Sequence, residues 1–200
     1  HRVQVLAASF SHVRAHQPEV GAKPRDELLD GVAYRWYPTP RYQGNGLGRA
    51  LNIASFLRQV WADGDRLVRE FRPDVVISSS TYPMDFWVAR RIARRTAARL
   101  VHEVHDLWPL SPIELSGMSR HHPFAVLCQW AEDAAYRDAD LVVSILPKVQ
   151  EHMATRGLDL AKLVIVPNGI DPEEWQRPPQ PLRADVQRVI ATLPERLRTL

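Results

Sequence analysis

The stretch LVHEVHDLWP, residues 100–109, decides the predicted fold, because a short apolar run ends there in titratable side chains and a proline. Continuous apolar runs of this length are typical of strands that are covered on both faces, as in a parallel sheet. Comparable runs predict strands at 3–8, 32–37, 74–80, 100–104, 141–145 and 163–166.

Helical patterns alternate with these runs. Apolar residues recur at helical spacing over 48–71, 85–98 and 124–136, and a shorter helix is expected after Pro147. Pro147 suits the first turn of that helix, and Gly157 suits its C-terminal cap. The alternation predicts an α/β fold with a Rossmann-like parallel sheet, right-handed crossovers and helices on its faces.

The composition excludes several classes of protein. No apolar run approaches the roughly 18 residues that span a bilayer, and the single cysteine, Cys128, allows no disulfide within the chain. The 26 basic residues leave a net charge of only +3, far below that of a dedicated nucleic-acid binder. We therefore expect a cytoplasmic protein without a nucleic-acid partner.

The last part of the sequence differs from the rest. Prolines are dense over 172–181 and resist regular structure, and a charged helical pattern follows over 183–200. We expect residues 1–175 to form one domain, and 176–200 to be a proline-rich linker with the start of a second domain that this sequence does not include.

Titratable side chains gather at the end of the strand at 100–104. In open α/β sheets, ligands bind outside the carboxyl ends of the strands. Alternation places Glu103 and His105 on one face and His102 and Asp106 on the other, which argues against a four-ligand metal site from this segment alone. A histidine beside a carboxylate can accept or donate a proton. A hydrogen-bonded core histidine and a capping aspartate fit the pattern equally well.

Polar residues also end two other predicted strands. Ser79, Ser80 and Thr81 could bind sugar or phosphate oxygens, or cap the helix that begins near Asp85, and capping is favoured. After the strand at 163–166, the Asn168-Gly169 pair predicts a tight turn and, with the prolines beyond it, a hinge between domains.

Two more segments are favoured as plain structure. The glycines at 44–48 lack the ending of a phosphate-binding P-loop, so a loop is expected there. The arginines at 90, 91, 94 and 95 pair at a spacing of four along one helix flank. A solvated helix face is favoured for them over attraction to anionic lipid headgroups.

Several segments, in their order along the chain, resemble the GT-B glycosyltransferases of family 4, in particular the WbuB-like subgroup that builds O-antigen and capsular polysaccharides. They are DGV at 30–32, RPDVVI at 72–77, EVHDLWP at 103–109, ADLVVS at 139–144 and VPNGID at 166–171. Together they extend over nearly all of residues 1–175.

The resemblance implies a retaining, metal-independent hexosyltransferase without a cofactor. Its donor, a nucleoside-diphosphate sugar, would be held by a C-terminal domain absent from this sequence, so this chain alone would be inactive. Residues 1–175 would be the acceptor-side domain. The acceptor would be a saccharide, often linked to polyprenyl diphosphate, which implies a place at the inner face of the membrane, touching it through Arg90, Arg91, Arg94 and Arg95. A homodimer is compatible with the resemblance.

The resemblance also implies roles for single residues. His105 and Asp106 are the candidate catalytic residues, and Asn168 and Gly169 mark the hinge. Acceptor contacts are expected at Ser79, Ser80, Thr81, Glu103, Trp108 and Ser144.

The sequence departs from that subgroup in two ways. The strand and glycine loop that open the family's domain have no counterpart before residues 3–8. The strands that normally flank that strand are then expected to leave unpaired backbone groups, so either the sequence is cut short or the sheet rearranges. The second departure is His105, where many members of the subgroup have arginine.

Two other functions stay open. A sugar-nucleotide 2-epimerase on a similar scaffold would change a UDP-sugar without any acceptor. A non-catalytic Rossmann-like binding module would meet nucleic acid through the arginine helix, and that binding would weaken steeply with salt.

Overall fold

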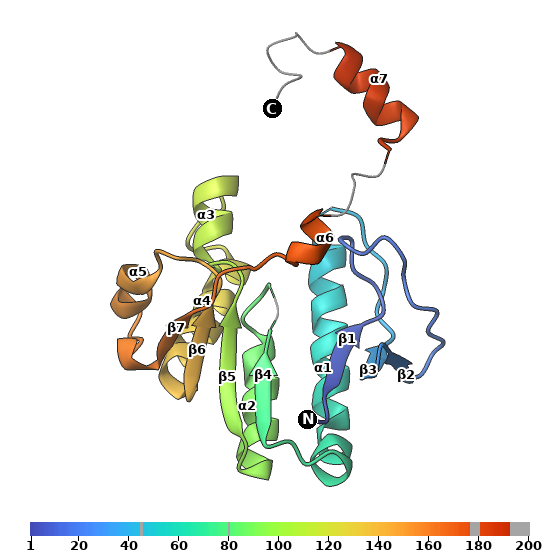
Figure 1. Ribbon diagram of the computed structural model, residues 1–200. Helices are drawn as coiled ribbons and strands as arrows, with labels where there is room; N and C mark the ends of the chain where they lie inside the picture. Colours follow the sequence, from blue (N-terminus) through green and yellow to red (C-terminus); the bar gives the residue numbers. More distant parts are fainter. Residues whose placement is uncertain (45, 80, 177–180, 193–200) are drawn as a thin grey trace. The chain divides into compact units, whose positions relative to one another are not determined.

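The computed structural model describes residues 1–44, 46–79, 81–176 and 181–192. They fall into two compact units, His1–Pro167 and Asn168–Leu200, which are described separately. The first unit contains a four-stranded sheet with the order β4 (Val75–Ser78), β5 (Arg99–Val104), β6 (Leu141–Ser144) and β7 (Leu163–Ile165) (Figure 1). Every neighbouring pair of these strands is parallel, which confirms the predicted α/β class.

Helices cover this sheet and supply its core. They are α2 (Asp85–Thr96), α4 (Pro123–Asp138) and α5 (Gln150–Thr155). Phe86 of α2, Tyr136 of α4 and Met153 of α5 are fully buried together with Val142 of β6. Burying such side chains contributes about 1.5–3 kcal/mol each. This packed core therefore holds the strands of the sheet and their carboxyl ends in place.

A second sheet precedes it in the chain, with the order β1 (Gln4–Ala8), β3 (Val32–Tyr37) and β2 (Arg25–Leu29). β1 and β3 are parallel, whereas β2 and β3 form an antiparallel hairpin. Asp30 and Gly31 turn this hairpin with φ angles of 49° and 79°. The sequence prediction missed β2, because its residues RDELL are mostly charged and exposed rather than apolar.

No strand pairing among the described residues joins the two sheets: β1 pairs with β3, and β4 pairs with β5. One edge of β1 and one edge of β4 therefore lack a strand partner in this part of the chain, so the unpaired edges expected from the sequence are present. Val75 and Ile77 on β4 are 51% and 58% exposed.

Helix α1 (Leu47–Glu70) holds the two sheets in one unit. It packs against β1, β3 and α2. Phe56 and Val60 of α1 are buried in one apolar cluster with Tyr37 of β3, and Leu6 of β1 and Val76 of β4 pack against that cluster. Hydrophobic burial, rather than a continuous hydrogen-bonded sheet, thus connects the two sheets.

Some helix predictions were wrong at their boundaries. The helix after Pro147 begins at Gln150 instead, although Gly157, with φ 89°, follows it as predicted. The prediction also missed α3 (Leu110–Ser116), whose Pro112 is tolerated because the first turn of a helix has backbone N–H groups without intrahelical partners.

The described part of the second unit contains the helices α6 (Pro172–Gln176) and α7 (Ala184–Thr192). α6 lies in the stretch predicted to resist regular structure. It forms because proline suits a first helical position, and because the Asp171 side chain accepts a hydrogen bond from Glu173 N at 2.9 Å. The rest of the predicted helix, 193–200, lies outside the described residues. The predicted division at 175/176 stays a prediction.

Candidate functional site

Three side chains meet at the carboxyl ends of β4 and β5. The Ser79 hydroxyl contacts the Glu103 carboxylate and lies 3.0 Å from His105 Nε2. His105 Nε2 is 3.4 Å from Glu103 Oε2, and the side chains of His105 and Glu103 are 36% and 30% exposed. A hydroxyl, a carboxylate and an imidazole thus converge at a place open to solvent, and we call them the strand-end cluster. The arrangement can bind hydroxyl groups and exchange a proton with one of them.

His102 lies behind this cluster on the other face of β5. It is buried, and its Nδ1 lies 2.9 Å from the Ser78 hydroxyl, with the rings of Phe86 and Tyr136 edge-on to it. Burial, followed by repulsion from His105, lowers the pKa of His102 to about 4. The imidazole is therefore neutral at pH 7 and part of the core, and the predicted alternation of faces along 102–105 is confirmed.

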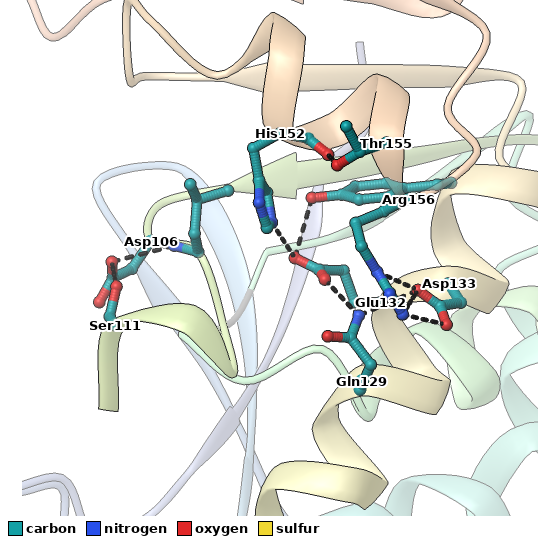
Figure 2. Close-up of polar contacts among 10 residues, drawn as sticks. Asp106, Ser111, Gln129, Glu132, Asp133, His152, Thr155 and Arg156 are labelled. Carbon is teal, nitrogen blue, oxygen red and sulfur yellow. Dashed lines mark hydrogen bonds and ion pairs between the residues drawn. The ribbon is translucent and has the colours of Figure 1, made fainter. Parts of the chain in front are cut away.

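Asp106 uses its carboxylate within the following turn. Its Oδ1 accepts hydrogen bonds from Leu107 N, at 2.9 Å, and from the Ser111 hydroxyl (Figure 2). These contacts match the capping alternative of the sequence analysis. A catalytic role for Asp106 stays a prediction.

Trp108 follows the strand-end cluster in the chain and packs against residues of α1 and α4. Its ring lies edge-on to Phe124 and beneath the Arg49 guanidinium, which is 5.6 Å from the ring centroid. Its indole Nε1 is buried and has no hydrogen-bond partner in the described part of the chain. Thr81, Trp108 and Glu132 line a cavity of about 10 Å³, which is near the smallest size that holds one water molecule.

A buried acidic network, missed by the sequence analysis, borders that cavity on α4. Glu132 is 3% exposed. Its carboxylate accepts from the Tyr136 hydroxyl at 2.9 Å and from Gln129 Nε2 at 2.7 Å, and His152 Nε2 lies 3.9 Å away (Figure 2). Burial is the main cause that raises the pKa of Glu132 to about 7. We call these four residues the buried network.

The signal for this network was present in the sequence. Cys128, four residues before Glu132, and Ala135, three residues after it, are buried, so Glu132 lies on the apolar side of α4. A charged residue on that side needs partners, and Gln129 and Tyr136, three residues before and four after, are in reach along the helix. Asp133, next to it, instead pairs with Arg156 at 2.6 Å.

The remaining predicted residues lie elsewhere. Ser144 is fully buried at the end of β6, where its hydroxyl accepts from Leu146 N at 3.1 Å, so the structure does not bring it to the strand-end cluster. Ser80 lies outside the described residues. Asn168 and Gly169 belong to the second unit.

The four arginines of α2 each face a carboxylate. Arg90 and Arg94 share Asp138, and Arg91 and Arg95 share Asp65. The pairs are those expected from the spacing of four. Because two carboxylates offset part of their charge, the membrane role stays a prediction. In the described ranges, no helix has the length and apolar character needed to cross a membrane.

Comparison with known proteins gives a family match. The model of the Glycosyl transferase 4-like domain matches residues 1–169. No curated protein matches the chain.

Solved structures of Anabaena Alr3699/HepE are similar at low identity. For the complex with UDP-glucose, the TM-score is 0.47 at 16% identity, over 80% of this chain and 36% of that one. The complex with UDP and glucose gives the same TM-score and identity over 37% of that chain. The chain therefore spans little more than a third of the length of these relatives.

Proposed function

We propose, on the premise that the chain belongs to the Glycosyl transferase 4-like domain family, that the protein is a retaining glycosyltransferase. The donor in this proposal is a nucleoside-diphosphate sugar, and the acceptor is a saccharide, free or linked to polyprenyl diphosphate, in the synthesis of a cell-surface polysaccharide. No metal takes part.

The strand-end cluster is the observation that carries this proposal. A sugar acceptor presents hydroxyl groups, and Ser79, Glu103 and His105 offer a hydroxyl, a carboxylate and an imidazole within 3.4 Å of one another. Because the cluster is open to solvent at a strand end, an acceptor can reach it, as ligands do in other open α/β sheets.

In the proposed step, an acceptor oxygen forms a bond to the anomeric carbon of the donor sugar on the face from which the diphosphate departs, so the configuration is retained. The bond from that carbon to the diphosphate oxygen breaks. The nucleoside diphosphate leaves with the electron pair, and the proton of the acceptor hydroxyl passes to His105 Nε2. Glu103, at 3.4 Å, stabilises the positive imidazolium, and Ser79 orients the imidazole or the acceptor.

Replacing His105 tests this role. In the full-length protein, His105→Ala should lower the rate of sugar transfer at least about tenfold, which is typical of losing a general base or its orientation. His121→Ala is the matched control, because His121 is exposed and outside the cluster. Unchanged transfer in His105→Ala would remove His105 from the mechanism.

Two further measurements separate the alternative functions. Incubation with a UDP-sugar and no acceptor should leave the sugar unchanged, whereas a 2-epimerase would convert it. Binding to nucleic acid that weakens steeply with salt would favour the binding module. The 200-residue chain on its own should show no turnover, because donor binding is assigned to a domain outside this sequence.

A further inference from the structure

A large open cavity lies at the carboxyl ends of the other sheet. It has a volume of about 910 Å³ and is bounded by the loop after β1 and the loop after β3. Its lining includes Phe10, His16, Glu19, Arg25, Thr39 and Arg41. It shares no lining residue with the small cavity beside Trp108, and none of these residues was singled out from the sequence.

The walls of this cavity are built by side-chain hydrogen bonds to the backbone. The Gln17 amide accepts from Ser11 N at 3.1 Å and donates to Ser11 O at 2.7 Å and to Arg14 O at 2.8 Å, which closes the loop after β1 on itself. Thr39 N donates to the Ser9 hydroxyl at 2.9 Å and ties the two loops together. A cavity held in this way is pre-organised, so a ligand orders few side chains on binding.

The second loop is fixed in the same manner. Asn52, buried on α1, donates to Pro40 O at 2.9 Å. Tyr42 accepts or donates a 2.7 Å hydrogen bond with His12 and lies edge-on to Phe10, with ring centroids 5.1 Å apart. Arg41, between these anchored residues, therefore has a fixed backbone and a free side chain.

The polar lining favours an anion. Arg25 already donates to Glu19 O and to the Glu27 carboxylate. Arg41 and His16, however, make no hydrogen bond or ion pair with any described residue. A guanidinium is the side chain best suited to a carboxylate or phosphate, and among the described residues that line the cavity only Glu19 carries a carboxylate.

The rest of the lining favours a sugar as the body of the ligand. The Thr39 hydroxyl accepts from Phe10 N at 3.3 Å and lies 3.4 Å from the Ser9 hydroxyl, so this hydroxyl pair can still donate to a ring hydroxyl, and Phe10 offers an apolar ring surface. We propose that this cavity binds a saccharide that carries an anionic group, either a carboxylate or a phosphate, with Arg41 contacting the anion. The proposal rests on the proposed function: the cavity holds the anionic part of the acceptor, and the strand-end cluster holds its reacting hydroxyl group.

Calorimetric titration of the 200-residue chain tests this proposal without donor or turnover. The probes are methyl glucuronide, glucose 1-phosphate and the neutral methyl glucoside. One or both charged sugars should bind, with a Kd on the order of 1 mM or lower, at least about tenfold more tightly than the neutral sugar. The charged sugar that binds identifies the anion as carboxylate or phosphate.

Variants then assign the binding to Arg41. Arg41→Gln should raise the Kd of the charged sugar about tenfold. Arg41→Lys should raise it less, because lysine keeps the positive charge but lacks the planar guanidinium. Arg58→Gln, on an exposed position of α1, should change nothing. Equal binding of charged and neutral sugars, no binding at all, or an equal loss in Arg58→Gln would overturn the proposal. Each of these leaves the His105→Ala transfer assay unaffected, so the two proposals fail separately.

Discussion

The strand-end cluster and the buried network use the same kinds of group, a carboxylate, a histidine and a hydroxyl, in opposite surroundings. Ser79, Glu103 and His105 are open to solvent, whereas Glu132 is 3% exposed and satisfied by Tyr136 and Gln129. A buried carboxylate that already has partners serves the folded state, and an exposed one keeps hydrogen-bonding capacity for a ligand. Burial, rather than residue type, therefore separates a structural group from a functional one here.

The largest expected difference in the free energy of unfolding is between the variants Glu132→Ala, in the buried network, and His105→Ala, in the strand-end cluster. At pH 5, where the folded protein keeps Glu132 protonated, Glu132→Ala leaves the Tyr136 hydroxyl without its partner and creates a cavity, while the Gln129 amide keeps only its bond to Asp133. The free energy of unfolding should fall by about 3 kcal/mol. His105→Ala should change it by less than about 0.5 kcal/mol. Urea denaturation of both variants measures these changes in the free energy of unfolding. Equal losses of stability would contradict the distinction between the buried network and the strand-end cluster.

The pH dependence of stability sharpens the comparison. The pKa of Glu132 is raised from 4.5 to about 7, so between these values the unfolded chain releases a proton that the folded protein keeps. Stability therefore falls as pH rises through this window, by on the order of 2 kcal/mol. The groups facing Glu132 are Tyr136, His152 and, through Asp133, Arg156.

His102 changes the stability with pH in the opposite direction. Its pKa is lowered from 6.5 to about 4, so the unfolded chain binds a proton that the folded protein refuses, and stability rises with pH through that window. The two effects oppose each other in the native protein. In Glu132→Gln the opposing effect is removed, while those of His102 and of His152, whose pKa burial also lowers, remain, and urea denaturation at pH 4.5 and 6.5 should show stability rising with pH. A fall of stability in this variant would contradict the assignment to Glu132.

Two adjacent serines give the smallest test. Ser78→Ala removes the partner of His102 Nδ1, 2.9 Å away, and should cost about 1 kcal/mol of stability with transfer preserved. Ser79→Ala should leave stability within about 0.5 kcal/mol and lower transfer about fivefold, the equivalent of one hydrogen bond. Thermal unfolding and transfer assays on both variants would show whether the two effects separate as expected.

The sequence predicted the parallel sheet because β4 to β7 are short apolar runs, and it predicted that Glu103 and His105 share a face because strand side chains alternate. β2 was missed because hairpin pairing, rather than apolar content, makes it a strand. Helical spacing places Glu132 on the apolar side of α4, but it does not reveal that His152 of α5 lies beside it, so the network as a whole was missed. The contacts of Asp106 depend on α3, a helix that the sequence pattern did not indicate.

The open edge of β4 has a practical consequence for handling the chain. That edge has no strand partner among the described residues, and Val75 and Ile77 beside it are exposed. It can act as a template to which an extended segment adds, including the same edge of another molecule. Unpaired edge strands of this kind promote concentration-dependent aggregation. A positive charge on that edge, as in Ile77→Lys, should reduce this aggregation, because many proteins carry lysine on exposed edge strands.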